Sequence, residues 1–249
     1  MPAHDSLPLA LIGHSGAAGR ALRDLGLVGI SVPTDDLEAT LAACRTLRFS
    51  GALVHPSLET ALLPFTQADP AAQRTGRVDA IAFAGGTHGT FALVDALIDV
   101  VEASGYATRG ASALLIGSST RDLALALPLT RLGFTDIGVV AETTPEAEGA
   151  AKHLPAGVRT YPISRRDASV ATLAERADLI VLTAGSLPAG LLQPYHTLVD
   201  LTGRVTGGAA GTVMDLSRLP AQRLCRQLSH ATGQRFHVDE LTPLLPSLS

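Results

Sequence analysis

Short apolar runs alternate along this chain with segments in which apolar positions recur at helical spacing. The apolar runs predict strands near Leu7–Ile12, Gly29–Val32, Gly51–Val54, Val78–Phe83, Ala113–Ile116, Ile137–Val140, Val158–Tyr161, Leu179–Leu182 and Thr197–Asp200. The helical spacing predicts helices over Gly19–Leu25, Leu37–Leu47, Phe91–Ala103 and Pro220–Thr232, the second of them opened by Asp35 or Asp36 as N-cap. This alternation is typical of an α/β protein.

The stretch 113–143 reads as strand, glycine turn, helix and strand, which is the opening unit of a dinucleotide-binding fold. Gly117 lets the chain turn off the first strand toward a helix N-terminus, which offers N–H groups to a pyrophosphate. The second and third glycines of the usual motif are here Ser119 and Asp122. Asp122 stabilises the helix start but repels a phosphate, and Pro128 is expected to kink the helix.

Hydroxyl groups and one acidic residue complete the predicted cofactor site. The candidate cofactor-binding residues are Gly117, Ser118, Ser119, Thr120, Arg121, Glu142 and Thr143. Glu142 lies just after the second strand, where a carboxylate accepts hydrogen bonds from a ribose diol and repels a 2′-phosphate, so the residues favour NAD over NADP. Glu142 as a cap of the following helix, and the whole unit as a purely structural βαβ motif, remain alternatives.

The segment from Gly105 to Gly110 indicates a boundary between two α/β domains. We predict a substrate-type domain over residues 1–105, joined by about 225–249, and a Rossmann-like domain over 106–224. The last helix is then expected to return to the first domain.

Composition narrows the classes of partner. The 249 residues are 46% hydrophobic, but no run reaches about 18 apolar residues and residues 1–12 lack a signal-peptide pattern, so we expect a cytoplasmic protein without a membrane partner. A net charge of −4, no basic run and no tryptophan argue against nucleic acid. The two cysteines and eight histidines show no metal-ligand spacing, so no metal is expected. A homodimer is a candidate assembly, because the sequence does not determine the oligomeric state.

Several segments together resemble the shikimate/quinate dehydrogenase family, over roughly residues 7–240. The resemblance lies in FSGALVHP at 49–56, GRVDAI at 76–81, ADLIV at 177–181, LVD at 198–200, and Gln222 followed by Thr232-Gly233, one residue out of register. It implies a substrate domain followed by a nicotinamide-binding domain, reduction of a keto acid of the dehydroshikimate type, and NADP as cofactor.

The catalytic residues that the resemblance implies are absent from this chain. The family's lysine falls on Leu58, and its aspartate falls within Gly89-Thr90-Phe91-Ala92; Asp95 lies one helical turn later. The NADP-reading segment becomes Ala141-Glu142-Thr143, and the N-terminal serine motif is reduced to the surroundings of His14-Ser15-Gly16.

Histidines are the candidate replacements, because imidazole transfers protons near neutral pH. We predict His55 and His88 as catalytic residues on loops after strands. The candidate substrate-binding residues are His14, Ser15, Thr87, Thr90 and Gln222. Exposed histidines without a chemical role are the alternative.

The leading hypothesis is a divergent NAD(P)-dependent oxidoreductase that acts on a small hydroxylated carboxylate like shikimate or quinate. The alternative is a catalytically inactive relative that binds a nucleotide or a small acid as a sensor or partner subunit.

Overall fold

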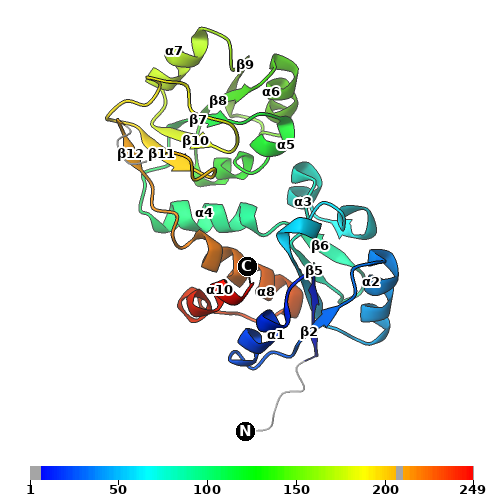
Figure 1. Ribbon diagram of the computed structural model, residues 1–249. Helices are drawn as coiled ribbons and strands as arrows, with labels where there is room; N and C mark the ends of the chain where they lie inside the picture. Colours follow the sequence, from blue (N-terminus) through cyan, green and yellow to red (C-terminus); the bar gives the residue numbers. More distant parts are fainter. Residues whose placement is uncertain (1–6, 206–209, 249) are drawn as a thin grey trace. The chain divides into compact units, whose positions relative to one another are not determined.

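The computed structural model describes residues 7–205 and 210–248, which form two compact units (Figure 1). The first unit comprises residues 1–96 with 218–249, and the second comprises residues 97–217. The division falls inside α4 (Leu93–Ala103), before the glycine segment at which the sequence analysis set its boundary. Whether each unit is a domain with the limits predicted above stays a prediction.

The first unit is a mixed six-stranded sheet with helices from both ends of its sequence. Its strands run in the order β2-β1-β3-β5-β6-β4, with β5 antiparallel to both of its neighbours. The elements are β1 (Leu9–Ile12), α1 (Gly16–Arg23), β2 (Gly29–Val32), α2 (Leu37–Thr46), β3 (Gly51–Val54), η1 (Pro56–Leu58), η2 (Leu63–Phe65), β4 (Gln67–Ala68), α3 (Pro70–Thr75), β5 (Ala80–Ala82), β6 (His88–Thr90), α8 (Leu219–Thr232), α9 (Val238–Leu241), η4 (Thr242–Leu244) and α10 (Leu245–Leu248).

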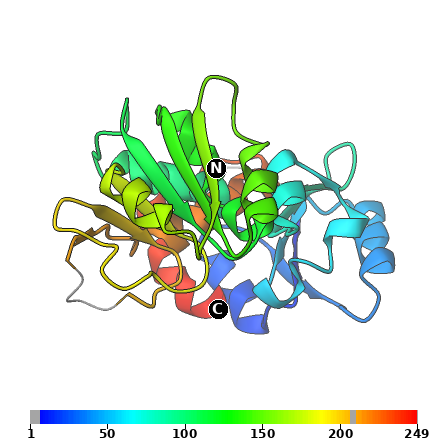
Figure 2. The same cartoon turned by 90° about the horizontal axis from the view of Figure 1, so that it is seen from above.

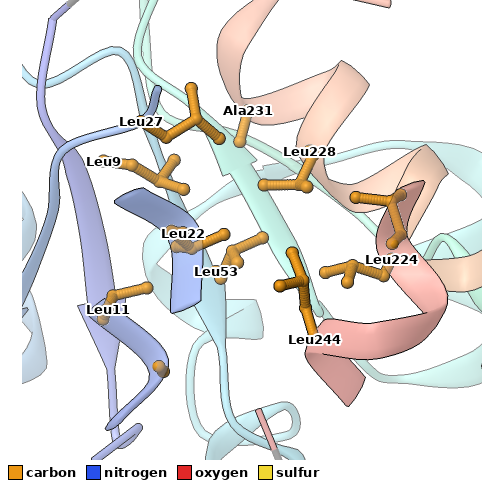
Figure 3. Packing of buried hydrophobic residues seen from close by; sticks show 11 residues of the cluster. Leu9, Leu11, Leu22, Leu27, Leu53, Leu224, Leu228, Ala231 and Leu244 are labelled. Atoms are coloured by element: carbon orange, nitrogen blue, oxygen red, sulfur yellow. The ribbon is translucent and has the colours of Figure 1, made fainter. Parts of the chain in front are cut away.

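The core of the first unit joins its N-terminal strands to α8. Leu9 and Leu11 of β1 and Leu53 of β3 pack with Leu224 and Leu228 of α8 (Figure 3). The three-to-four-residue spacing of the buried α8 positions puts them on one helix face, which explains why this segment forms a helix against the sheet. The predicted return of the last helix to the first unit is therefore confirmed.

The second unit is an entirely parallel sheet in the order β12-β11-β10-β7-β8-β9, whose strands lie side by side in Figure 2. This is the Rossmann order 6-5-4-1-2-3, with its switch point between β7 and β10. The elements are β7 (Ser112–Ile116), α5 (Thr120–Leu123), η3 (Leu127–Leu132), β8 (Asp136–Ala141), α6 (Thr144–Ala151), β9 (Arg159–Ser164), α7 (Ser169–Glu175), β10 (Leu179–Leu182), β11 (Thr197–Asp200) and β12 (Thr212–Val213). The predicted α/β fold class is thereby confirmed.

Three details differ from the sequence prediction. The helix after Gly117 is not merely kinked: α5 ends at Leu123, and Pro128 lies in the first turn of η3, because proline has no N–H for a continuing helix. His88–Thr90 is strand β6 rather than loop. The residues after α8, expected as a tail, form α9, η4 and α10.

Within the described residues, no helix is both long and apolar enough to cross a membrane. Both cysteines are free thiols: Cys44 is buried, and Cys225 packs against the core of the first unit. Their predicted role as ordinary packing residues agrees with this placement.

Gly51→Ala is expected to lower the free energy of unfolding strongly. A Cβ at Gly51 would overlap the carbonyl oxygens of Ala231 and Ile81, which are backbone atoms that cannot rotate away. Overpacking of this kind costs about 1–3 kcal/mol or more. Urea denaturation monitored by circular dichroism measures this change in the free energy of unfolding. The matched control, Gly16→Ala at the start of α1, meets only the end of the Arg20 side chain and should be neutral or stabilising; similar losses in both variants would contradict the packing argument.

Candidate functional site

A pocket of about 290 Å³ lies in the first unit along one face of α8. Its lining is mainly apolar, with polar side chains only from His14, Arg223 and Gln227. The lining residues are His14, Leu53, Val54, Pro56, Leu93, Leu219, Pro220, Arg223, Leu224, Gln227, Leu245 and Leu248.

The turn after β1 and the end of β3 bring two of the predicted histidines together. The rings of His14 and His55 lie edge to face, 5.4 Å apart between centroids. Nδ1 of His55 is 2.8 Å from the Ser57 hydroxyl oxygen, so that ring is fixed from its other side. Ser15 follows His14 as the exposed N-cap residue of α1. His14, rather than His55, is among the residues that line the pocket.

His14 is neutral at physiological pH. Burial and, to a smaller extent, the neighbouring His55 lower its pKa to about 4, against the opposite effect of hydrogen bonds to the backbone of Leu248 and Val54. A neutral imidazole beside the pocket can accept a proton, although its low pKa makes it a weak base.

Other predicted site residues lie elsewhere in the first unit. Thr87 lines a different pocket, between α2 and the loops before β4 and β6. The Thr90 hydroxyl donates a hydrogen bond to Oδ2 of Asp69 at 2.6 Å, and Asp69 is the N-cap residue of α3. His88 begins β6, and its carbonyl oxygen accepts a hydrogen bond from Nε2 of His230 at 2.9 Å. The structure thus does not bring His88, Thr87 or Thr90 to the pocket of His14.

On α8 the pocket is lined by Arg223 instead of the predicted Gln222. The one-residue mismatch in register noted in the sequence is the reason, since a shift of one residue turns a helical position by about 100°. Gln222 lies on the helix that lines the pocket but is not among the lining residues, and its role in substrate binding stays a prediction. Leu58, at the position of the family's lysine, lies in η1.

Arg223 is held by two carboxylates that the sequence analysis did not single out. Its Nε is 2.8 Å from Oδ2 of Asp79, and its Nη2 contacts Oε1 of Glu59. Glu59 is 1% exposed and Asp79 is fully buried. Arg77 adds a second pair to Glu59 at 3.0 Å. We call Glu59, Asp79, Arg77 and Arg223 the buried ion network.

Burial and charge oppose each other in this network. Burial raises the pKa of both Glu59 and Asp79, and the Arg223 guanidinium counteracts that rise without cancelling it. Phe91 lies between the cations, with the guanidinium carbons of Arg223 and Arg77 5.2 and 5.3 Å from the ring centre. Phe91 stands in the segment where the resemblance places an aspartate. The only signal for this network in the sequence was that Glu59 and Asp79 are acidic residues in or next to weakly matching segments.

In the second unit, the residues predicted to bind a nucleotide follow the carboxyl ends of β7 and β8. At Gly117 a Cβ would lie 2.8 Å from the Thr183 hydroxyl oxygen and 2.9 Å from Cγ of Leu123, so only glycine fits at this turn. The strand order and this glycine are both features of a dinucleotide-binding unit.

Two hydroxyl groups of the loop, those of Ser119 and Thr120, already donate hydrogen bonds within the fold. Ser119 is the N-cap of α5, and its N–H and hydroxyl both donate to Asp122, at 3.0 and 2.9 Å. Thr120 donates its hydroxyl to the carbonyl oxygen of Glu146 at 2.9 Å. Asp122 therefore occupies donors that a phosphate would need. Arg121 is exposed, and the carbonyl oxygen of Ser118 accepts the N–H of Glu142.

Glu142 and Thr143 follow β8 as predicted. Glu142 is half-exposed, with Arg165 and Arg166 each 3.9 Å from its carboxylate. The helix cap belongs to its neighbour instead: Thr143 precedes α6 and donates its hydroxyl to Glu146 at 3.0 Å. The carboxylate of Glu142 is thus not used in capping α6. In the part of the chain that the structure describes, no cluster of His, Cys, Asp and Glu is arranged to hold a metal.

Comparison with known proteins gives a consistent result. No family model matches the chain. The shikimate dehydrogenase (NADP(+)) of Moorella thermoacetica is 29% identical over 208 residues, which cover 76% of this chain and 68% of the relative. The chain is therefore similar to the shikimate/quinate dehydrogenases.

Solved structures establish the fold along nearly the whole chain. The shikimate 5-dehydrogenase of Listeria monocytogenes, in complex with shikimate and NAD, matches with a TM-score of 0.75 and 13% identity, over 96% of both chains. The quinate dehydrogenase of Corynebacterium glutamicum, in complex with NAD, matches with a TM-score of 0.74 and 19% identity, over 98% of this chain and all of the other. A 5-ketofructose reductase of Gluconobacter shares the fold, with a TM-score of 0.71 and 13% identity over 98% of this chain and 99% of the other.

Arg223→Gln is expected to destabilise the protein by about 3–5 kcal/mol, because it leaves the buried Asp79 without a cation and Glu59 with only Arg77. The loss should grow with pH. Raised pKa values mean that folded Glu59 and Asp79 keep protons that the unfolded chain has released, so stability falls as pH rises through the folded pKa values. Without Arg223 those values rise further, so the cost should be larger near about pH 8 than near about pH 5.

Chemical denaturation of the unchanged protein and of Arg223→Gln at both pH values measures this difference in the free energy of unfolding. The matched control is Arg218→Gln, which removes an exposed ion pair with Asp239 from the same segment and should cost less than about 1 kcal/mol at either pH. A pH-independent loss in Arg223→Gln would contradict the assignment of buried, charged carboxylates.

Proposed function

We propose that the protein is an NAD(P)-dependent oxidoreductase that interconverts an alcohol and a ketone on a small hydroxylated carboxylate of the shikimate or quinate type. The observation that carries the proposal is the parallel Rossmann sheet with its switch point between β7 and β10, in a chain that also has a pocket in its first unit. Relatives named as shikimate and quinate dehydrogenases support the same reaction class.

The residues of the second unit fit a dinucleotide in part. Gly117 leaves space at the end of β7, and the half-exposed Glu142 lies where the adenosine ribose is read. The loop at Ser119 fits less well, because Asp122 takes its N–H and hydroxyl. A nicotinamide cofactor supplies the acceptor or donor of the hydride. Gly117, Ser118, Thr120, Arg121, Glu142 and Thr143 are the residues proposed to surround it.

In the alcohol-oxidising direction, a hydride leaves the carbinol carbon for the cofactor and the hydroxyl proton must go to a base. His14 is the residue that the pocket offers, and His55 lies behind it at ring-contact distance. The pair can therefore take over the proton transfer that the resemblance assigns to a lysine and an aspartate. His88, the second histidine predicted as catalytic, has no comparable place at this pocket.

The second candidate function is a non-catalytic relative that binds a nucleotide or a small acid. The observation that favours it is the closed hydrogen bonding of the Ser119–Asp122 loop, together with Leu58 and Phe91 in the segments of the usual catalytic pair. A cytoplasmic location, a homodimer and the absence of a nucleic-acid partner stay predictions from the sequence.

Thermal melting with NAD, NADP and their reduced forms, with and without shikimate or quinate, separates the two functions. A ligand at about 100 times its dissociation constant stabilises the folded state by about 2.7 kcal/mol, which shifts the midpoint by several degrees. Dinucleotide shifts together with turnover, followed by the absorbance of the reduced nicotinamide, are expected. Shifts without turnover would favour the binding relative, and no shift with any dinucleotide would refute the oxidoreductase.

His14→Ala and His55→Ala are expected to lower kcat by about 10²-fold or more, because general acid–base catalysis contributes about 10²–10⁴-fold. Steady-state kinetics measure this, with His153→Ala, an exposed histidine of the second unit, as control. His88→Ala tests the remaining predicted histidine. Unchanged kcat in both His14→Ala and His55→Ala would exclude the histidine pair.

A further inference from the structure

A second pocket of the first unit, about 510 Å³ in volume, lies between α2 and the loops before β4 and β6. We call it the α2 pocket; none of the described residues lines both it and the pocket of His14. Its lining also differs in kind, because Glu38 and Arg45 of α2 and Gln67 of β4 all bring polar groups to it. Polar groups of this kind favour a ligand that can hydrogen-bond with them.

Thr87 lines the α2 pocket with a hydroxyl group that the fold does not use. The residue is only 9% exposed, yet within the described part of the chain its hydroxyl has no hydrogen-bond partner. The structure does not bury the hydroxyl oxygen completely, so the group stays open to a ligand in the pocket. Thr66, which lines the same pocket, shows the contrast, since its hydroxyl donates to the carbonyl oxygen of Leu63 at 3.2 Å. A hydroxyl this deeply placed is ordinarily paired, and a ligand can supply the partner.

Two glycines before Thr87 shape the loop at this side of the pocket. Gly85 has φ +74°, a left-handed conformation that favours glycine. At Gly86 a Cβ would lie 2.7 Å from Nε2 of His88, so the histidine ring lies where a side chain would otherwise be. His88, predicted from the sequence as a catalytic residue, therefore supports the loop that carries Thr87.

Glu38 and Arg45 give the α2 pocket one negative and one positive group, so their charges sum to zero (1 − 1). Among the described residues neither side chain has an ion-pair or hydrogen-bond partner. They stand seven residues apart, about 10.5 Å along the helix axis, which keeps them from pairing with each other. A ligand with a net charge gains little overall from such a lining, whereas ligand hydroxyls can donate to the carboxylate and accept from the guanidinium.

Phe65 adds an aromatic wall beside these polar groups. It lines the pocket and is 39% exposed, although it is a large apolar residue. Leu41 and Ala42 of α2 supply further apolar surface in the same lining. An aromatic ring next to donors and acceptors suits a ligand that carries CH groups on one face and hydroxyls around its edge.

We propose that the α2 pocket binds a small uncharged polyol, such as a monosaccharide or a cyclitol. Its CH face packs on Phe65, and its hydroxyls bond to Thr87, Gln67, Glu38 and Arg45. A hydroxyl both donates and accepts, so the same ligand group pairs with a carboxylate, a guanidinium, an amide and a threonine hydroxyl. This site is additional to the proposed oxidoreductase function and does not depend on it.

Saturation-transfer NMR of the full chain with D-fructose and with myo-inositol tests the site. We expect one or both polyols to bind. The Kd should rise about fivefold in Thr87→Val, which removes a neutral hydrogen bond, and about tenfold in Arg45→Ala, which removes a charge-assisted one. The matched controls are Thr46→Val on α2 and Arg23→Ala on α1, which change exposed residues outside the lining and should keep the affinity.

His14→Ala distinguishes the α2 pocket from the pocket of His14, and it should leave polyol binding unchanged. Loss of binding in His14→Ala, with unchanged affinity in Thr87→Val and Arg45→Ala, would place the polyol in the other pocket and overturn the proposal. Failure of both polyols to bind would overturn it as well, as would binding of zwitterionic glycylglycine or anionic shikimate at Thr87 and Arg45 in their place. Dinucleotide binding is measured separately, so the oxidoreductase proposal is unaffected by any of these results.

Discussion

The first unit depends on the pairing of Arg223 with Glu59 and Asp79. Two carboxylates with almost no solvent exposure are tolerable in a protein interior only because a guanidinium from α8 reaches both of them. Glu59 follows η1 and Asp79 precedes β5, so a single side chain connects the C-terminal helix to two distant parts of the N-terminal sequence. The same side chain lines the pocket, and its position therefore shapes the space that a ligand would occupy.

Part of the departure of this chain from the pattern that the resemblance implies lies next to that network. Where a lysine and an aspartate are expected from the resemblance, Leu58 and Phe91 stand, and the charges lie instead on Glu59, Asp79 and Arg223. Because Arg77 adds the second positive charge that balances the two carboxylates, the network contributes binding geometry and stability more readily than proton transfer. His14 and His55 are then the titratable pair closest to the pocket, and the low pKa of His14 follows from the same burial.

Sequence patterns predicted most of the fold because apolar periodicity reports directly on buried strands and helices. Gly29–Val32, Gly51–Val54 and Leu179–Leu182 agree residue for residue with the strands. Three-residue β6 was missed, since its glycine and polar residues gain their strand conformation from pairing with β5 rather than from local preference. The site was harder to predict: Arg223, Arg165 and Asp79 act through partners 13 or more residues away, and no local pattern records such contacts.

The two units differ in how their sequences are ordered, and this has a consequence for synthesis. The second unit is one continuous segment, 97–217, whereas the first needs residues 218–249 to cover β1 and β3 and to bring Arg223 to its carboxylates. On the ribosome the second unit can close before the first, although the first is translated earlier. Until α8 emerges, the leucines of β1 and β3 and the acids of the buried ion network have no covering partner, so the N-terminal half is the part most exposed to chaperones and to misassembly.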